Sequence, residues 1–160
     1  MRDALPKLLN RARLGRAMSR EIVSLPPTGA DRLRRLGVAL VYLYGSEAVG
    51  RSNALSDIDV GVIFRDPAPL HRRAARADLH TAVSDCLASA LTPTLSRELD
   101  VVLLQTASPV LQFEAINAGQ PLFVDDSAFQ ANYEAAVIRD YLDVRPLVEM
   151  HYQAALERVA

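Results

Sequence analysis

The stretch Leu43-Tyr-Gly-Ser-Glu-Ala-Val-Gly-Arg-Ser-Asn-Ala-Leu-Ser-Asp-Ile-Asp-Val-Gly-Val-Ile-Phe64 decides the fold that this sequence predicts. An apolar run ends at Gly45-Ser46, ten residues follow, and a second apolar run then contains Asp57 and Asp59. We expect both carboxylates in the middle of a strand, where Asp is depleted and where an unpaired buried carboxylate is costly. A placement of this kind points to a functional role.

The spacing of the two aspartates predicts a metal site. Side chains alternate across a strand, so Asp57 and Asp59 should share one face while Ile58 and Val60 occupy the other. Two carboxylates this close repel each other unless a cation lies between them, and hard divalent cations prefer oxygen ligands. The Gly-Ser turn after the first strand offers backbone N–H groups and a hydroxyl to a phosphate. Together these features predict a magnesium-bound nucleoside triphosphate.

A third carboxylate is expected on a later strand. Asp100 has apolar neighbours on both sides, which favours it, whereas Glu98 shares its face and stays an alternative. A purely structural interpretation of the aspartate pair is that they cap a turn or bind an arginine such as Arg51 or Arg97. That would be the better interpretation for one Asp, but the whole constellation favours catalysis.

These residues resemble the nucleotidyltransferases related to DNA polymerase beta, whose pattern is Gly-Ser, a short spacer, Asp-x-Asp and a third carboxylate on a neighbouring strand. Ser56-Asp-Ile-Asp59 matches the minimal nucleotidyltransferase branch. Within that branch the chain is most similar to the MntA-type antitoxins, which are paired with HEPN ribonuclease toxins. The likeness extends to residues 108–123 and 139–145 and covers roughly residues 28–145.

The resemblance implies an enzyme that transfers AMP from ATP to a tyrosine hydroxyl of a HEPN toxin and thereby neutralises the toxin. It also implies three carboxylates that hold two Mg²⁺ ions, and three residues that bind the nucleotide. The expected catalytic and metal-ligating residues are Asp57, Asp59 and Asp100, and the expected nucleotide-binding residues are Gly45, Ser46 and Arg51. The order Gly50-Arg51 reverses the order of the family pattern.

Two other functions stay open. The chain could be a small-molecule nucleotidyltransferase that acts on a compound such as an aminoglycoside, although such enzymes usually need a second domain to shape the acceptor pocket. It could also neutralise its partner by binding alone, with an inactive site. A partner inactivated by less than one equivalent of this protein with ATP would separate catalysis from binding.

Composition predicts a folded protein in a reducing compartment. The chain has 160 residues, half of them apolar, with a net charge of −1 and one cysteine, Cys86. No apolar run is long enough for a membrane span, so we expect a cytoplasmic location. Residues 1–35 hold nine Arg/Lys against three Asp/Glu, and the rest holds nine against sixteen. We expect a basic helical arm over 1–27, packed on its own domain and not on nucleic acid, and a nucleotidyltransferase domain over 28–160.

Hydrophobic periodicity predicts an α/β fold of the polymerase-beta type, with a mixed β-sheet flanked by helices and a helical C-terminal segment. Pro26-Pro-Thr-Gly29 is expected to be a loop, Cys86 to lie in the core, and Pro146 to kink or end the last helix. The expected strands are 38–43, the one that holds both aspartates, 99–104 and 121–124. The expected helices are 4–14, 30–36, about 70–91, 109–118 and the segment 126–160.

Overall fold

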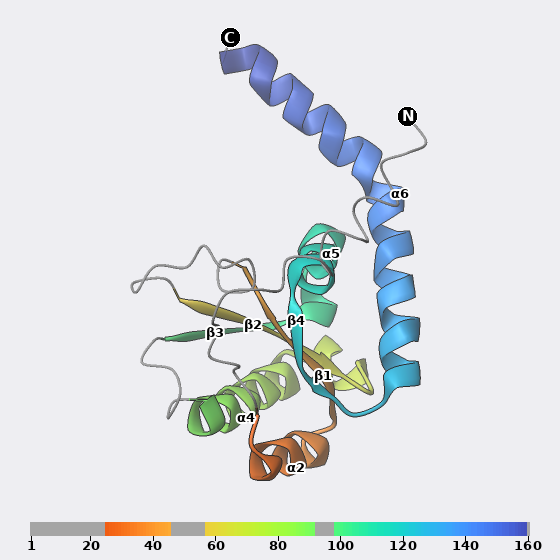
Figure 1. Ribbon diagram of the computed structural model, residues 1–160. Coiled ribbons are helices and arrows are strands. Elements are labelled where there is room, and N and C mark those ends of the chain that lie inside the picture. The colour runs from red at the N-terminus through yellow and green to blue at the C-terminus, as the bar shows by residue number, and fades with distance from the viewer. Residues whose placement is uncertain (1–24, 46–56, 92–97, 160) are drawn as a thin grey trace, which may run out of the picture.

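The computed structural model describes residues 25–45, 57–91 and 98–159, and in this part of the chain a four-stranded sheet forms the centre (Figure 1). Its strands are β1 (Val38–Tyr44), β2 (Ile58–Phe64), β3 (Leu99–Leu103) and β4 (Gln120–Val124). The spatial order is β3-β2-β1-β4, with β1 antiparallel to both β2 and β4, and β2 parallel to β3. The predicted mixed sheet is therefore confirmed.

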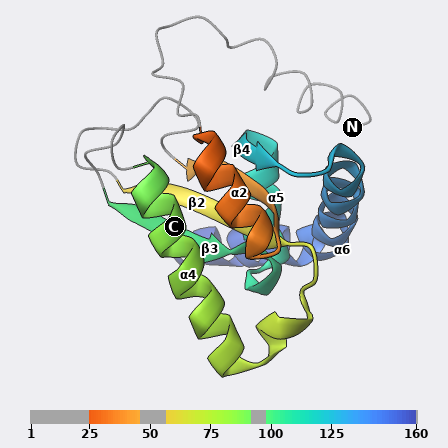
Figure 2. The ribbon, with the colours of Figure 1, turned by 90° about the horizontal axis from the view of Figure 1, so that it is seen from below.

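Helices cover both faces of the sheet. Figure 2 shows α2 (Pro27–Arg35) and α4 (Arg73–Leu91) on one face, with α5 (Pro109–Ala118) and α6 (Ser127–Val159) beyond the other. Two short 3-10 turns, η1 (Ala68–His71) and η2 (Leu104–Thr106), connect the layers. Every residue of β1 is buried, because a central strand with both faces covered has no side exposed to water. No helix in the described ranges is long and apolar enough to cross a bilayer.

The side chains of β2 point alternately to the two faces of the sheet. Ile58, Val60 and Val62 belong to the apolar cluster that includes residues of α2 and α4. Ile63 belongs to a second cluster with Ala115 of α5. Asp59 has the opposite orientation from its two neighbours, and so it lies on the α5 side of the sheet.

The expected loop at Pro26–Gly29 is wrong, because α2 already begins at Pro27. Proline is tolerated in the first turn of a helix, where its missing N–H has no intrahelical partner to lose. Gly29 is buried inside the helix, and a Cβ added to it would lie 3.0 Å from Cβ of Ala90 in α4. The glycine therefore permits close packing of two helices, and does not mark a turn.

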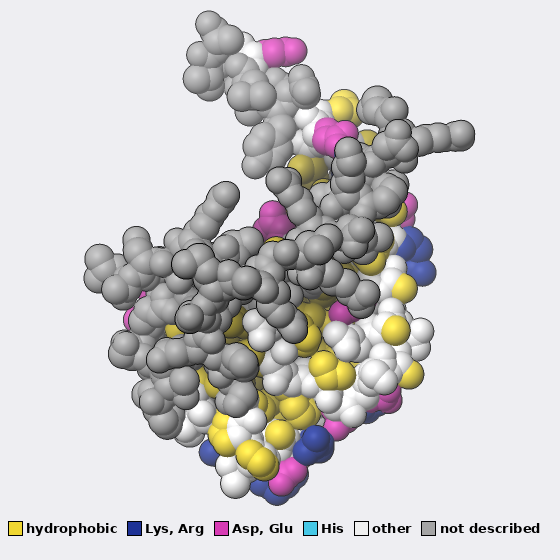
Figure 3. All heavy atoms as spheres, viewed as in Figure 1, with side chains coloured by type: hydrophobic (Ala, Val, Ile, Leu, Met, Phe, Trp, Pro, Cys, Tyr) yellow, Lys and Arg dark blue, Asp and Glu magenta, His cyan; other side chains and the backbone are white. Residues whose placement is uncertain are grey.

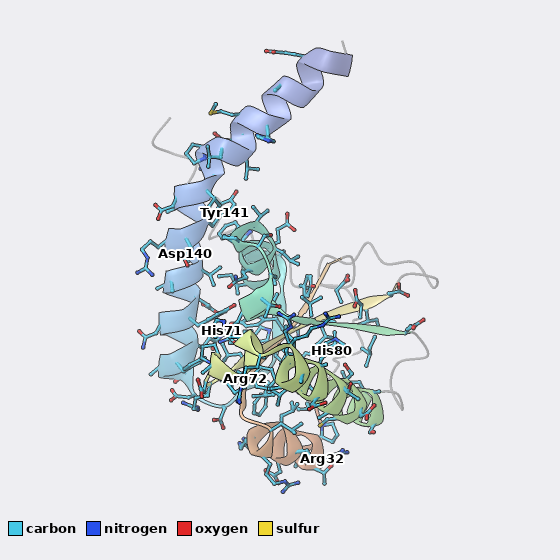
Figure 4. The ribbon with its side chains drawn as sticks, turned by 180° about the vertical axis from the view of Figure 1, so that it is seen from behind. Arg32, His71, Arg72, His80, Asp140 and Tyr141 are labelled. Carbon is cyan, nitrogen blue, oxygen red and sulfur yellow. The ribbon has the colours of Figure 1, made fainter. Side chains whose placement is uncertain are left out.

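Helix α4 carries an apolar stripe that includes Cys86, so the expected core position of this cysteine is confirmed. Val83, Cys86, Leu87 and Leu91 are buried against the sheet. Burial also raises the pKa of the Cys86 thiol, which agrees with a core cysteine. On the neighbouring turn, a ring nitrogen of His80 lies 2.9 Å from the carbonyl oxygen of Val101 and joins α4 to β3 (Figure 4).

Helix α6 begins where the sequence predicts but continues through Pro146. The Asp126 carboxylate accepts hydrogen bonds from N–H of Ala128 and Phe129, which caps the helix. Tyr141 stacks on Phe113 of α5 with ring centroids 3.9 Å apart, where α6 passes α5 (Figure 4). The helix contains Pro146 and changes direction part way along its length, so the proline does not end it (Figure 1).

Beyond Tyr141 the helix α6 leaves the body of the molecule. Leu142, Leu147 and Met150 are large apolar side chains with 44%, 63% and 67% of their surface exposed. In Figure 3 the projecting part of the chain carries apolar side chains among charged ones. The expected helix 4–14 and most of the expected arm 1–27 lie outside the described residues.

Candidate active site

The end of β1 and the start of β2 meet at Gly45 and Asp59. Tyr44 is the last residue of β1 and is paired with Asp59, and Gly45 follows with a φ of +71°. A Cβ added to Gly45 would lie 2.1 Å from Oδ2 of Asp59. No side chain fits there while Asp59 keeps its position, so glycine lets the carboxylate lie directly against the turn.

Asp100 is the partner of Asp59 in the neighbouring strand. The two residues occupy the same register position in the parallel pair β2 and β3. Parallel neighbours in register point to the same face, so both carboxylates face the α5 side. Each of them also lines the same cavity, which Glu98 does not.

The placement expected for Asp57 is wrong in one respect. Asp57 precedes β2 and is exposed, so only Asp59 lies inside the strand. The ladder to the next strand starts at Ile58, whose N–H donates to the carbonyl oxygen of Glu98 at 3.0 Å. Asp57 remains close enough for its charge to act on Asp59, but it does not line the cavity.

The cavity has a volume of about 490 Å³ and two different walls. The sheet provides an acidic wall with Tyr44 and Gly45 beside the two aspartates. The facing wall belongs to α5, from which Leu111, Glu114 and Ala118 line the space. The complete lining is Tyr44, Gly45, Asp59, Asp100, Val102, Leu111, Glu114 and Ala118.

Burial and like charge disturb the titration of this site. The pKa of Asp59 is raised, first because burial disfavours the charged carboxylate and then because Asp100 and Asp57 repel it. Burial, followed by the charges of Asp59, Asp100 and Glu114, raises the pKa of Tyr44 to about 12. The Tyr44 phenol therefore stays protonated at neutral pH and keeps an O–H donor at the cavity.

The donors at this site suit a hard cation. Asp59 and Asp100 present carboxylate oxygens to one space, and a divalent cation would relieve the repulsion that raises the pKa of Asp59. Within residues 25–45, 57–91 and 98–159, no group of three or more His, Cys, Asp or Glu side chains is arranged to hold a metal ion.

Other expected site residues lie outside the described part of the chain, namely Ser46 and Arg51. Conversely, the structure adds Tyr44 and Glu114, which the sequence analysis did not single out. Tyr44 could have been found from its place directly before Gly45 in a strand. Glu114 carries no such signal, because only the packing of α5 on the sheet brings it to the cavity.

A second cavity of about 300 Å³ holds none of the expected site residues. It lies near the opposite end of β2, where the Gln105 side chain exchanges two hydrogen bonds with the backbone of Phe64. His71 and Arg76 are among its lining residues, and no carboxylate is. The acidic cavity is therefore the candidate active site.

Comparisons with known proteins point to the same chemistry. The sequence profile of the family Polymerase beta, Nucleotidyltransferase matches residues 32–128. No match was found among curated protein sequences.

Solved structures give three further likenesses. A toxin-antitoxin crystallised with AMP-PNP is 27% identical, with a TM-score of 0.53, and the match covers 81% of this chain and 93% of that chain. A mutant MntA-HpeT toxin-antitoxin is 26% identical with a TM-score of 0.52 and the same coverage. A structure from Shewanella oneidensis, 21% identical with a TM-score of 0.50, covers 81% of this chain and 90% of that chain and shows the fold alone. The predicted resemblance is confirmed.

Proposed function

Because the chain belongs to the Polymerase beta nucleotidyltransferase family, we propose that it transfers AMP from ATP to a hydroxyl group of a protein. The observation that carries this proposal is the in-register pair of Asp59 and Asp100, which face one cavity beside Gly45. Three features of a phosphoryl-transfer site come together here. The glycine turn follows β1, and the two acids lie on β2 and β3. We assign the activity to residues 28–160.

The nucleotide is expected at the Gly45 end of the cavity. The positive φ of Gly45 turns the backbone directly after β1, and successive N–H groups at such a turn can bind phosphate oxygens. Ser46 would add a hydroxyl, and Arg51 a positive charge for the leaving pyrophosphate. The structure with AMP-PNP, an ATP analogue, supports ATP as the substrate.

Asp57, Asp59 and Asp100 would hold two Mg²⁺ ions, since their oxygen donors suit this metal. When bound, the ions would neutralise phosphate charge and lower the pKa of the attacking hydroxyl. Asp100 would either complete the second metal site or take the proton of that hydroxyl as a general base. A bond forms between the acceptor oxygen and the α-phosphorus, the bond from the α-phosphorus to the bridging oxygen breaks, and pyrophosphate leaves.

We propose that the acceptor is a tyrosine of a HEPN ribonuclease toxin, so that the protein is an antitoxin. Two structures that are 27% and 26% identical to this chain are toxin-antitoxins, which supports the proposal. The projecting end of α6, with exposed Leu147 and Met150, offers apolar surface for such a partner. AMP on the tyrosine would abolish the ribonuclease activity of the toxin.

The experiment uses a purified HEPN ribonuclease toxin, with ATP and magnesium. If neutralisation is catalytic, one molecule of this protein per ten of toxin inactivates all of the toxin, and mass spectrometry finds AMP on a toxin tyrosine. Omission of ATP should abolish the effect. Inhibition that needs equimolar protein, ignores ATP and leaves the toxin unmodified would show that the protein acts by binding alone.

A further inference from the structure

Tyr44 carries a hydroxyl that the proposed reaction does not use. The side chain has only 7% of its surface exposed, and it lines the acidic cavity. Among the described residues, its hydroxyl has no hydrogen-bond partner. In the same ranges, the only fully enclosed side-chain oxygen or nitrogen without a partner is Oγ of Ser84, so the Tyr44 hydroxyl keeps access to the cavity that it lines.

Two other tyrosines on the same side of the sheet do have partners. Tyr42 lies two residues earlier in β1, and its hydroxyl donates to Oε1 of Glu134 at 2.5 Å and accepts from Gln130 at 3.0 Å. The Tyr133 hydroxyl donates to a side chain of α5 at 3.0 Å. Buried hydroxyls are normally hydrogen-bonded, because the loss of water costs free energy that only a new partner offsets. Tyr44 differs in facing a cavity, so its partner is expected to be a ligand.

Tyr44 extends the row of the two aspartates across the sheet. It is the antiparallel partner of Asp59, and Asp59 is the parallel partner of Asp100. Directly paired residues point to the same face, so the phenol and the two carboxylates face α5 from three adjacent strands. Because a tyrosine side chain is longer than an aspartate side chain, its hydroxyl can reach a group that the carboxylates bind through a cation.

The chemistry of the hydroxyl selects the kind of ligand atom. A phenol is protonated at neutral pH and donates one hydrogen bond. Phosphate oxygens are acceptors, and a hydrogen bond to a charged oxygen is roughly twice as strong as one between neutral groups. The leaving pyrophosphate is expected at the turn after Gly45. The α-phosphate, which the acceptor attacks, is then expected at the row of Tyr44, Asp59 and Asp100.

We propose that the Tyr44 hydroxyl donates a hydrogen bond to a non-bridging oxygen of the α-phosphate, and that Tyr44 is a further catalytic residue of this site. The ring belongs to a buried cluster with Leu104 of η2 and Ala115 of α5, so the donor is held in place before the nucleotide binds. During transfer the donor stabilises negative charge on the α-phosphoryl group. This inference rests on the proposed AMP transfer and adds a residue that contacts its nucleotide.

The first measurement is the nucleotide affinity, which depends on no acceptor. The full chain is titrated in a calorimeter with magnesium and α,β-methylene-ATP, an analogue that cannot release pyrophosphate. Tyr44→Phe removes one hydrogen bond to a charged oxygen and should raise the Kd about tenfold. The rate of AMP transfer to a HEPN toxin should fall by about tenfold or more.

Two phosphorothioate nucleotides identify the atom that the hydroxyl contacts. The Rp and Sp forms of ATPαS each replace one non-bridging oxygen of the α-phosphate with sulfur, which is a weaker hydrogen-bond acceptor. Tyr44→Phe should weaken the binding of one form about tenfold and leave the Kd of the other nearly unchanged. Both proteins are compared on the same nucleotide, so an effect of sulfur on the metal cancels in the ratio of their Kd values.

Tyr42→Phe is the matched control, because it removes a hydroxyl from the same strand and face but outside the cavity. It leaves Glu134 and Gln130 without their partner, so it should lower the Tm and keep the wild-type Kd for the nucleotide. Tyr44→Phe removes a hydroxyl that has no partner among the described residues, so it should keep the wild-type Tm.

Three results would overturn the inference. They are an unchanged nucleotide Kd in Tyr44→Phe, equal weakening of both ATPαS forms, and a fall in Tm as large as that of Tyr42→Phe. A wild type that binds no nucleotide would overturn the proposed function as well.

The two proposals can also fail separately. If the wild type shows the expected differences in Kd but transfers no AMP to the toxin, the contact of Tyr44 stands and the proposed function is wrong. If the wild type and Tyr44→Phe transfer AMP equally well, the proposed function stands and the role of Tyr44 is wrong.

Discussion

Asp59 and Asp100 occupy equivalent positions in two parallel strands, although 41 residues separate them in the chain. Their carboxylates face one cavity, and the charge of Asp100 is one of the causes that raise the pKa of Asp59. Two acids held in this way repel each other in the protein without ligands. The arrangement is costly to stability and useful for binding a cation.

Asp59→Asn should abolish AMP transfer and stabilise the metal-free protein at neutral pH. A raised pKa means that the folded state binds the proton more tightly than the unfolded state, so ionisation of Asp59 above its ordinary pKa of 3.8 lowers the free energy of unfolding. Asparagine removes this penalty. Thermal denaturation in EDTA at about pH 7 should show a higher Tm for the variant, and the gain should disappear at about pH 3. A lower Tm at neutral pH would contradict the raised pKa.

Gly45→Ala should cost both stability and activity, whereas Gly37→Ala should cost only stability. Both glycines have a positive φ, +71° and +79°, which alanine adopts at a cost of about 1–2 kcal/mol. A Cβ on Gly45 would also displace the Asp59 carboxylate, while a Cβ on Gly37 meets no atom within 4 Å. Urea denaturation gives the stabilities, and transfer of radiolabelled AMP gives the activities. Full activity in Gly45→Ala would show that the contact with Asp59 is not needed.

Asp100→Asn and Glu98→Gln should differ in activity. Asp100 is in register with Asp59 and lines the cavity, whereas Glu98 precedes β3 and does not line it. Loss of a general base or metal ligand should reduce kcat by about 100-fold or more, so we expect that loss for Asp100→Asn and nearly normal activity for Glu98→Gln. Circular dichroism confirms that each variant is folded. The reverse order of activities would identify Glu98 as the third carboxylate.

Truncation after Arg145 should weaken the complex with the partner toxin more than it lowers the Tm. The removed segment includes Leu147 and Met150, which are exposed, and the stacking of Tyr141 on Phe113 remains. The double variant Leu147→Glu with Met150→Glu tests the same surface in the full-length chain. Calorimetric titration measures the affinity and thermal denaturation measures the Tm. A large drop in Tm with unchanged affinity would mean that the segment serves the fold.

Local sequence determined most of the elements and the chemistry of the acids. The boundaries of α5 were predicted to the residue, because proline is favoured in the first turn of a helix, where Pro109 lies, and Gly119 favours the end of the helix. The apolar stripe of α4 follows from helical periodicity alone. The spacing of Gly45 and the aspartates also indicated the family, since the chemistry of phosphate and metal binding places these residues close together in the chain.

Only the tertiary structure decided which residues share the cavity. The pairing of Asp59 with Asp100 depends on the register of two strands, which is set by packing across the whole sheet. Glu114 reaches the site because α5 packs beside β1, and no pattern in its own segment records that contact. Pro26–Gly29 was mistaken for a loop for the same reason, because proline and glycine permit both a turn and a close helix contact. The contact of Gly29 with Ala90 of α4, 61 residues away, decides between them.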